Sequence, residues 1–156
     1  QGLRVFGPRK ETQRSWKGSK AFSKDLMKKY QIPTAAYETF DSAEAALAYL
    51  ETADFPIVLK ADGLALGKGV LICQNLDEAK EGVKEIMTDK KFGSAGNRLV
   101  VEEFMTGREV SVLSFVDGKT IKTMTSAQDH KRAGDGDTGL NTGGMGTFFT
   151  QSLLYG

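Results

Sequence analysis

Hydrophobic and polar positions divide the chain into short segments of alternating type. Residues 57–59 and 70–73 are apolar runs with the length of buried strands, and a glycine-containing segment separates them. Residues 99–101 form a third run of this kind, and residues 34–40 are a shorter strand candidate. We therefore predict four strands in the first two thirds of the chain.

Three segments carry apolar residues at helical spacing. The first begins at Ser19 and stops before Pro33, the second follows a cap at 41–42 and ends at Leu50, and the third covers about 75–87. With the strands, they give the order strand–helix–strand–loop–strand–helix, which predicts a small α+β unit. The predicted apolar faces consist of Phe22, Leu26, Met27 and Tyr30 in the first helix, Leu47 and Leu50 in the second, and Leu76, Ala79, Val83, Ile86 and Met87 in the third.

The last third of the chain has a different pattern. Residues 110–116 and 119–124 flank Asp117-Gly118, which predicts a hairpin with a tight turn. Residues 127–146 follow and contain six glycines among charged residues. This composition does not favour a packed helix or strand, so we predict a long functional loop here. At the other end of the chain, residues 1–6 alternate like the end of a strand.

Composition and charge exclude several classes of protein. Hydrophobic residues make up 40% and charged residues 26%, as in soluble globular proteins, and the net charge of +1 gives no case for nucleic-acid or membrane binding. The single cysteine, Cys73, lies in an apolar run, so we expect a buried thiol without a disulfide, in a reducing compartment. No apolar run reaches membrane-spanning length and no signal-peptide pattern is present, which predicts a cytoplasmic protein.

The segment between the first two apolar runs has the composition of an anion-binding loop. It reads KADGLALGKG and supplies Lys60 and Lys68 as cations, with glycines that let backbone N–H groups approach a polyphosphate. It is not a P-loop, because the spacing is one residue short and Gly69 replaces the hydroxyl that Mg²⁺ needs. A glycine-rich hairpin turn with two surface lysines explains the segment equally well.

Other residues suit the remaining parts of a nucleotide site. Lys20 lies in the first turn of a predicted helix, where anions are favoured, although a solvated lysine fits the pattern too. Residues 102–105 follow a strand and could meet adenine with backbone groups, and Glu103 or Glu109 could pair with ribose hydroxyls.

The glycine-rich segment 127–146 contains the only histidine. A calcium loop at Asp135–Gly139 is excluded, since its Asp/Asn and Gly positions and the distal Glu are wrong. His130 lies between Asp129 and Lys131, and a hydrogen-bonded structural histidine and a catalytic base are equally compatible with that setting.

Five segments together resemble one family. Residues 18–22, 32–34, 58–70, 102–104 with 107–111, and 127–146 are similar to the glycinamide ribonucleotide synthetases (phosphoribosylamine–glycine ligases) of the ATP-grasp superfamily. The resemblance implies an α+β ATP-grasp fold, truncated to the small ATP lobe and the beginning of the large lobe. It further implies three parts: an N-terminal strand and linker helix (1–33), the small lobe (34–104), and the start of the large lobe (105–156) with a substrate loop (127–146).

The family joins glycine to 5-phosphoribosylamine with ATP, through a glycyl phosphate, in purine biosynthesis. The resemblance therefore implies ATP, with Mg²⁺ held by ligands outside this chain, and small-molecule substrates as the only other partners besides missing N- and C-terminal parts of the enzyme. It also implies that this chain alone is inactive. A non-catalytic ATP-binding module, or an ATP-grasp ligase for another acid and amine, are the alternatives.

Site residues also follow from the resemblance. The nucleotide would be held by Lys20, Lys60, Asp62, Gly63, Gly67, Lys68, Gly69, Glu102, Glu103, Phe104 and Glu109, with residues 63–69 forming a mobile loop over the phosphates. The catalytic set would be Lys60, Asp129, His130, Lys131 and Arg132, and substrates would meet Asp129, Lys131, Asn141, Thr142, Gly143, Gly144 and Met145. No residue of this chain is expected to bind a metal.

Overall fold

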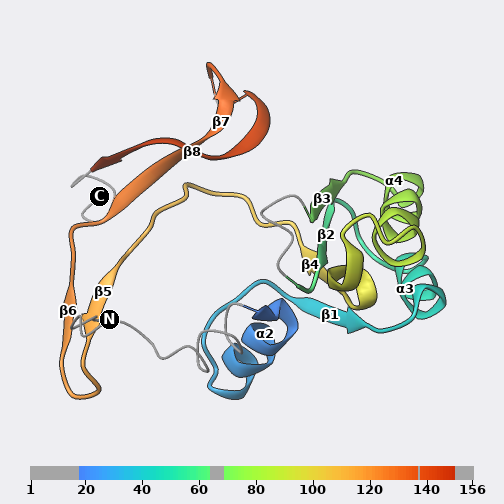
Figure 1. The fold of residues 1–156 in the computed structure, drawn as a ribbon, viewed down its shortest axis with the longest axis horizontal. Coiled ribbons are helices and arrows are strands. Elements are labelled where there is room, and N and C mark those ends of the chain that lie inside the picture. The colour runs from blue at the N-terminus through green and yellow to red at the C-terminus, as the bar shows by residue number, and fades with distance from the viewer. Residues whose placement is uncertain (1–17, 64–68, 137, 150–156) are drawn as a thin grey trace, which may run out of the picture. The chain divides into compact units, whose positions relative to one another are not determined.

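The computed structural model describes residues 18–63, 69–136 and 138–149 (Figure 1). The chain divides into two compact units, Gln1–Met105 and Thr106–Gly156, and each is described by itself. The predictions for residues 1–6, Gly67 and Lys68 lie outside the described residues.

A four-stranded antiparallel sheet forms the centre of the first unit. Its order is β1 (Tyr37–Phe40), β4 (Leu99–Glu103), β2 (Ile57–Ala61) and β3 (Val70–Cys73). The four predicted strands are therefore confirmed. β2 and β3 are antiparallel neighbours, and the Ala61 N–H donates to the Gly69 carbonyl at 2.9 Å next to their paired residues.

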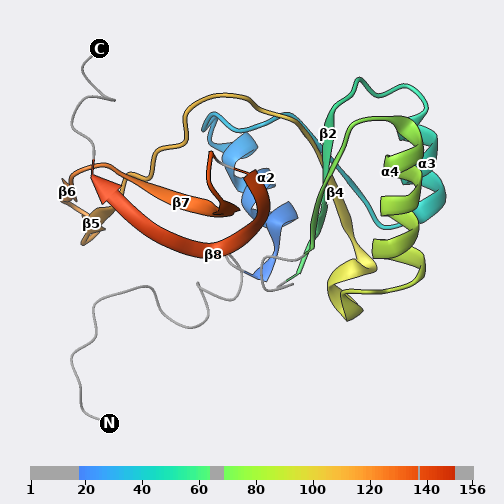
Figure 2. The same cartoon turned by 90° about the horizontal axis from the view of Figure 1, so that it is seen from above.

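Two helices cover one face of this sheet (Figure 2). They are α3 (Ala43–Leu50) and α4 (Leu76–Val83), which continues as a π-helix, Lys84–Thr88, before a 3₁₀ turn at Gly93–Asn97. The predicted caps are present, because Ser42 Oγ accepts from the Ala45 N–H and Asn75 Oδ1 accepts from the Glu78 N–H. The core between helices and sheet is fully apolar and includes Ala46, Leu50, Leu59, Cys73, Val83, Ile86, Leu99 and Val101.

Strand alternation decides which side chains face away from this core. In β2, Ile57, Leu59 and Ala61 are buried toward α3 and α4, whereas Val58 and Lys60 point to the other face. The register places Glu102 of β4 opposite Val58, and Val70 of β3 opposite Lys60. The face away from α3 and α4 therefore carries a lysine and a glutamate from neighbouring strands.

Helix α2 (Lys20–Lys29) lies against that second face (Figure 2). Its start at the Ser19 cap is as predicted, but its predicted apolar face is wrong in part, since Phe22 and Tyr30 are exposed. The buried positions are instead Ala21 and Lys24. The physical reason is that Glu102 of the sheet offers α2 a buried carboxylate, which pairs with the ammonium of Lys24 and so permits a lysine at this position.

The second unit consists of two hairpins. The first pairs β5 (Ser114–Val116) with β6 (Ile121–Thr123), as predicted but with shorter strands. Its turn is held by Asp117, whose carboxylate accepts from the N–H groups of Lys119 and Thr120, and by Gly118 at φ +94°. These two hydrogen bonds lower the pKa of Asp117.

The prediction of a long loop over residues 127–146 is wrong. They lie in a long hairpin of β7 (Ala127–Gly134) and β8 (Thr138–Phe149), with register shifts between His130 and Gly134. A hairpin needs only paired backbone groups, and no residue of β7 is buried, so a polar, glycine-rich sequence is compatible with this strand. Gly136, at φ +68°, lies where the two strands connect.

Candidate nucleotide site

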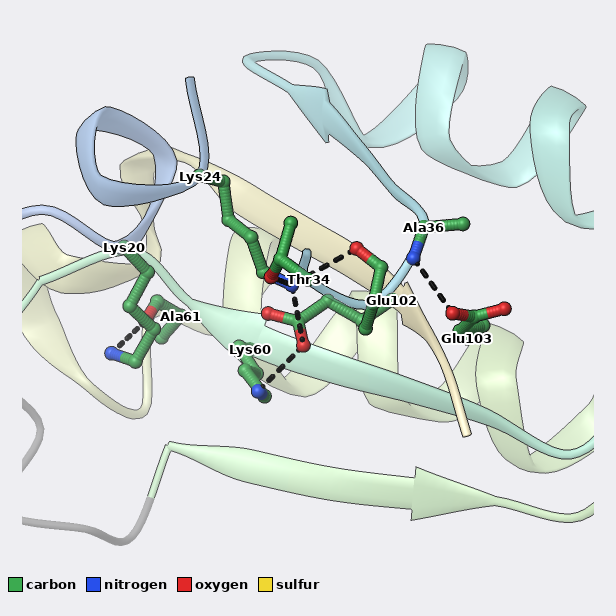
Figure 3. A network of polar contacts seen from close by, with 9 residues as sticks. Lys20, Lys24, Thr34, Ala36, Lys60, Ala61, Glu102 and Glu103 are labelled. Carbon is green, nitrogen blue, oxygen red and sulfur yellow. Dashed lines mark hydrogen bonds and ion pairs between the residues drawn. The ribbon is translucent and has the colours of Figure 1, made fainter. Parts of the chain in front are cut away.

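Glu102 is the centre of a polar network on the face of the sheet next to α2 (Figure 3). Glu102 is only 6% exposed. One oxygen, Oε2, accepts from Lys60 Nζ at 2.7 Å and lies 3.3 Å from Lys24 Nζ. Because a buried carboxylate is costly without cationic partners, these two lysines are what allows Glu102 to occupy this position.

Lys20 supplies a third cation beside this network. Its ammonium donates to the carbonyl of Ala61 at 2.6 Å and to that of Gly63 at 2.9 Å. Burial lowers the pKa of Lys20; the carboxylate of Asp62 opposes this shift and the charge of Lys60 adds to it. Lys20 is therefore fixed at the end of β2 and is not an ordinary solvated lysine of a helix surface.

Asp62 ties the start of α2 to the end of β2. Its carboxylate accepts from Ser19 Oγ at 3.0 and 3.1 Å and from the Ala21 N–H at 2.7 Å. A carboxylate at a helix N-terminus is also favoured by the helix dipole. In this geometry Asp62 positions Lys20, and its predicted contact with the cofactor stays a prediction.

A pocket of about 300 Å³ lies between α2 and the sheet. Its wall combines cations, one carboxylate and two apolar side chains. The residues that line it are Lys20, Ser23, Lys24, Met27, Lys60, Val70 and Glu102. Such a set can attract an anion to the lysines, place a flat apolar group against Val70 or Met27, and offer Glu102 as an acceptor to an amine.

Glu103, the residue after Glu102, forms hydrogen bonds with the segment that precedes β1. Glu103 Oε1 accepts from the Ala36 N–H at 2.9 Å, and the Glu103 N–H donates to the Ala36 carbonyl at 3.0 Å. Glu103 thus fixes the chain that enters β1, while Phe104 beyond it is partly exposed. Figure 3 shows the two neighbouring glutamates turned in different directions.

The glycine predictions divide into two kinds. Gly63 is sterically required, because an added Cβ would lie 2.8 Å from the Cβ of Ala95. Gly69 contributes its carbonyl to the base of the loop through the bond from Ala61. The mobile lid predicted for residues 63–69 falls mostly outside the described residues and stays a prediction.

The remaining predicted residues lie in the second unit, on and beside the β7–β8 hairpin. Lys131 forms an ion pair with Glu109, so these two predicted residues meet each other. Asp129 accepts from Thr147 Oγ1 at 2.9 Å, and Arg132 donates to the Gly139 carbonyl at 2.8 Å. His130 is exposed, which leaves both interpretations of it open.

The end of the predicted substrate set lies in β8. Thr142 Oγ1 donates to the Lys131 carbonyl at 2.8 Å and accepts from the Gly144 N–H at 3.1 Å, which links the two strands by side chain. Gly143 is exposed beside them. For Asn141 and Met145 only the backbone, which belongs to β8, is described.

Lys24 is the one member of the Glu102 network that sequence reasoning missed. It lies four residues after Lys20, on the same side of α2, and this spacing was the available signal. Lys24 is one of four lysines in α2, and nothing in the sequence around it indicates burial. Only the contact with Glu102 distinguishes it from the other lysines of this helix.

The described residues contain neither a cluster of metal ligands nor a membrane-spanning helix. Within residues 18–63, 69–136 and 138–149, no three His, Cys, Asp or Glu side chains are grouped as metal ligands. In the same part of the chain, every helix is too short or too polar to cross a membrane.

Known proteins match both the sequence and the fold. The phosphoribosylamine–glycine ligase of Pasteurella multocida is 53% identical over 147 residues, which are 94% of this chain and 34% of that protein. A bifunctional purine biosynthetic protein of Pichia angusta is 55% identical over 94% of this chain and 18% of its own length. The chain therefore spans about a third or less of these relatives.

Two solved structures superpose on this chain and share its fold. The phosphoribosylamine–glycine ligase of Thermotoga maritima superposes with a TM-score of 0.83 at 40% identity, over 92% of this chain and 36% of that one. The biotin carboxylase domain of Hydrogenobacter thermophilus 2-oxoglutarate carboxylase, solved with MgADP, superposes with a TM-score of 0.64 over 81% of this chain and 28% of that one; at 20% identity it shows a shared fold. The family model for the phosphoribosylglycinamide synthetase ATP-grasp (A) domain matches residues 18–154, and the chain belongs to this family.

Proposed function

We propose that this chain is the nucleotide-binding part of an ATP-dependent ligase that joins glycine to 5-phosphoribosylamine in purine biosynthesis. The observation that carries the proposal is the convergence of Lys20, Lys60 and Glu102 on one pocket, in a chain whose relatives are named for that reaction.

The phosphates of ATP would lie against Lys20 and Lys60. Both are compact cations at the end of β2 where the glycine-containing loop begins, and Lys60 keeps 26% of its side chain exposed. Exposure lets Lys60 exchange part of its contact with Glu102 for an oxygen of a phosphate. Since Lys20 is already held by two carbonyls, it needs little reorganisation to present its charge.

Adenine would lie at the other end of the pocket, beside Glu102. The carboxylate can accept a hydrogen bond from the exocyclic amine, and the backbone of residues 103–105 offers donors and acceptors to the ring nitrogens. Val70 and Met27 would contact the faces of the base. We assign the ribose to Glu109, as the resemblance implies.

The chemistry proposed is two successive displacements. A glycine carboxylate oxygen attacks the γ-phosphorus, ADP leaves, and glycyl phosphate forms; the amine of phosphoribosylamine then attacks the acyl carbon and inorganic phosphate leaves. The first step brings a carboxylate to a polyanion and the second releases an anion, so Lys20 and Lys60 would act by neutralising charge and fixing position. Magnesium supplies further neutralisation in such reactions, but no group of metal ligands exists among the described residues, and we assign it none of them.

The substrates would meet the β7–β8 hairpin. Lys131 and Arg132 carry the charge that a ribose phosphate requires, and Asp129 can accept from the ammonium of glycine. Three of the five residues in Asn141–Met145 are glycine or threonine, so the backbone of this segment would allow close approach of a small substrate. His130 is placed in this catalytic set, and we place the reaction in the cytoplasm.

ATP binding tests the proposal. Affinity is measured by calorimetry for the wild-type chain, for Lys60→Ala, and for Lys80→Ala, a control lysine that pairs with Glu51 on the surface. We expect Lys60→Ala to weaken ATP binding about tenfold or more, as the loss of one charged phosphate contact implies, and Lys80→Ala to leave it unchanged. Equal affinity of all three chains would contradict the phosphate assignment.

A further inference from the structure

Lys24 is a buried lysine with a complete set of partners. It is 7% exposed, and its ammonium donates to Thr34 Oγ1 at 2.8 Å and to the Ala35 carbonyl at 3.1 Å, with Glu102 Oε2 at 3.3 Å as the third partner. An ammonium has three donors, so these contacts account for all of them. Lys24 therefore has no donor left for a ligand, and its effect on a ligand must act through Glu102.

Lys24 and its partners come from three separate parts of the chain. Lys24 belongs to α2, Thr34 and Ala35 to the segment between α2 and β1, and Glu102 to β4. The ring of Tyr37 also lies 5.4 Å from the ammonium. Because these neighbours converge on one charge, the position of Lys24 is determined by the fold and does not depend on the pocket's occupant.

Lys24 and Lys60 bind the same oxygen of Glu102 (Figure 3). Among the residues that the structure describes, no hydrogen bond to the other oxygen, Oε1, is present. The two lysines differ in freedom, since Lys60 is about a quarter exposed whereas Lys24 is enclosed. When Lys60 turns toward a phosphate, Lys24 still holds Oε2, and Oε1 keeps its direction.

We propose that Lys24 is a positioning residue that makes the site selective for adenine over guanine. This inference rests on the proposed function. By fixing Glu102 as an acceptor, Lys24 presents Oε1 to the exocyclic amine of adenine, which is a donor. Guanine carries a carbonyl at the same ring position, so a fixed carboxylate repels it.

Loss of Lys24 has a consequence that a packing role does not share. With methionine at position 24, Lys60 is the only cation left for Glu102 in this network, and it must choose between the carboxylate and the phosphates. Glu102 then turns more freely, and the penalty against guanine falls. A residue that served packing alone would change the affinities for ATP and GTP by the same factor.

The test is the ratio of the dissociation constants for GTP and ATP. It is measured by calorimetry for the wild type, Lys24→Met, Lys24→Arg and Lys29→Met, the last replacing an exposed lysine of the same helix. We expect the ratio to fall about tenfold in Lys24→Met, to fall less in Lys24→Arg because the charge remains, and to stay constant in Lys29→Met. An unchanged ratio in Lys24→Met would overturn the inference.

A second variant covers the case in which Lys24→Met does not fold. Thr34→Val keeps the lysine but removes one of its three acceptors, and we expect the GTP-to-ATP ratio to fall about threefold. A ratio equal to that of the wild type would count against the proposal in the same way. If the wild type binds ATP and Lys60→Ala weakens it while both ratios stay constant, then only this inference fails; absence of ATP binding to the wild type would refute the proposed function too.

Discussion

The two units of the chain hold their candidate residues by different means. In the first unit, Leu50, Leu59, Val83, Ile86, Leu99 and Val100 are fully buried, and Lys60 and Glu102 extend from strands that this core supports. In the second unit, the strands β5 and β6 are exposed along their whole length, and side chains such as Leu113, Phe115 and Ile121 face outward. The first unit is thus stabilised by burial, the second mainly by backbone pairing.

This difference in burial indicates which unit holds its candidate residues rigidly. A packed core fixes Lys60 and Glu102 relative to each other, and such preorganisation suits recognition of a charged nucleotide. The hairpins of the second unit have no comparable core among their described residues, so we expect the residues on them to gain order from a substrate or from further protein. Four predictions test this comparison.

The largest effect separates two leucines. Leu59→Ala removes a fully buried side chain of the first unit and should lower the free energy of unfolding by about 2–5 kcal/mol. Leu113→Ala removes a side chain that is 62% exposed in the second unit and should change it by less than about 0.5 kcal/mol. Urea denaturation followed by circular dichroism measures both. Equal destabilisation would show that the second unit also has a packed core.

Glu102 and Glu109 allow a buried ion pair of the first unit to be compared with a half-exposed ion pair of the second. Glu102→Gln leaves Lys24 buried without its carboxylate and should cost about 3 kcal/mol. Glu109→Gln breaks an ion pair between two half-exposed side chains and should cost less than about 0.5 kcal/mol. The same denaturation experiment applies, with 0.5 M NaCl as a further condition. The contrast is refuted if Glu109→Gln proves as destabilising as Glu102→Gln.

Glycine substitutions probe how tightly each unit is packed. An added Cβ at Gly96 would lie 2.0 Å from the carbonyl oxygen of Ile86, so Gly96→Ala should destabilise the first unit by about 1–3 kcal/mol. An added Cβ at Gly146, in β8, would have no described atom within 4 Å apart from the neighbouring residues of the chain. Gly146→Ala should therefore change stability by less than about 0.5 kcal/mol. Thermal melting compares them. A neutral Gly96→Ala would mean that the 3₁₀ turn moves easily.

The smallest effect uses Cys73, which reports on the first unit because it is the chain's only cysteine. Burial raises the pKa of its thiol to about 11, and Glu78 adds to the shift. The folded state therefore retains a proton that the unfolded state loses earlier, so this contribution is complete below about pH 9 and is lost as pH rises toward 11. At pH 10 the loss is on the order of 1 kcal/mol.

Urea denaturation at pH 8 and pH 10, with Cys73→Ala as the control, measures this contribution. We expect the wild type to lose more stability between the two pH values than the variant does. An identical loss in both would show that the thiol is not protected by the core.

Sequence pattern alone predicted much of the first unit. The apolar runs located the four strands, and Ser42 and Asn75 located the starts of α3 and α4, because caps and periodicity are local properties. The orientation of α2 was not local. Lys24 is buried because of Glu102, 78 positions later in the chain, and no window around α2 contains that information.

In the candidate site, too, some residues could be predicted from the sequence, whereas contacts between distant residues could not. The resemblance identified Lys20, Lys60 and Glu102 as candidates, and the structure brings them to one pocket. It also uses Asp62 and Glu103 to anchor backbone groups, which composition could not distinguish from ligand contacts. For residues 127–146, glycine content predicted a loop, yet backbone pairing between its two halves makes a hairpin that composition does not reveal.

Hydrogen exchange with and without an unhydrolysable ATP analogue and Mg²⁺ tests the central claim most directly, namely that the first unit carries the nucleotide site. We predict slower exchange on binding in α2, in β2 and at residues 99–105, and no such slowing in Lys60→Ala. Unchanged exchange in all three segments of the wild type, or slowing confined to β7 and β8, would contradict the account.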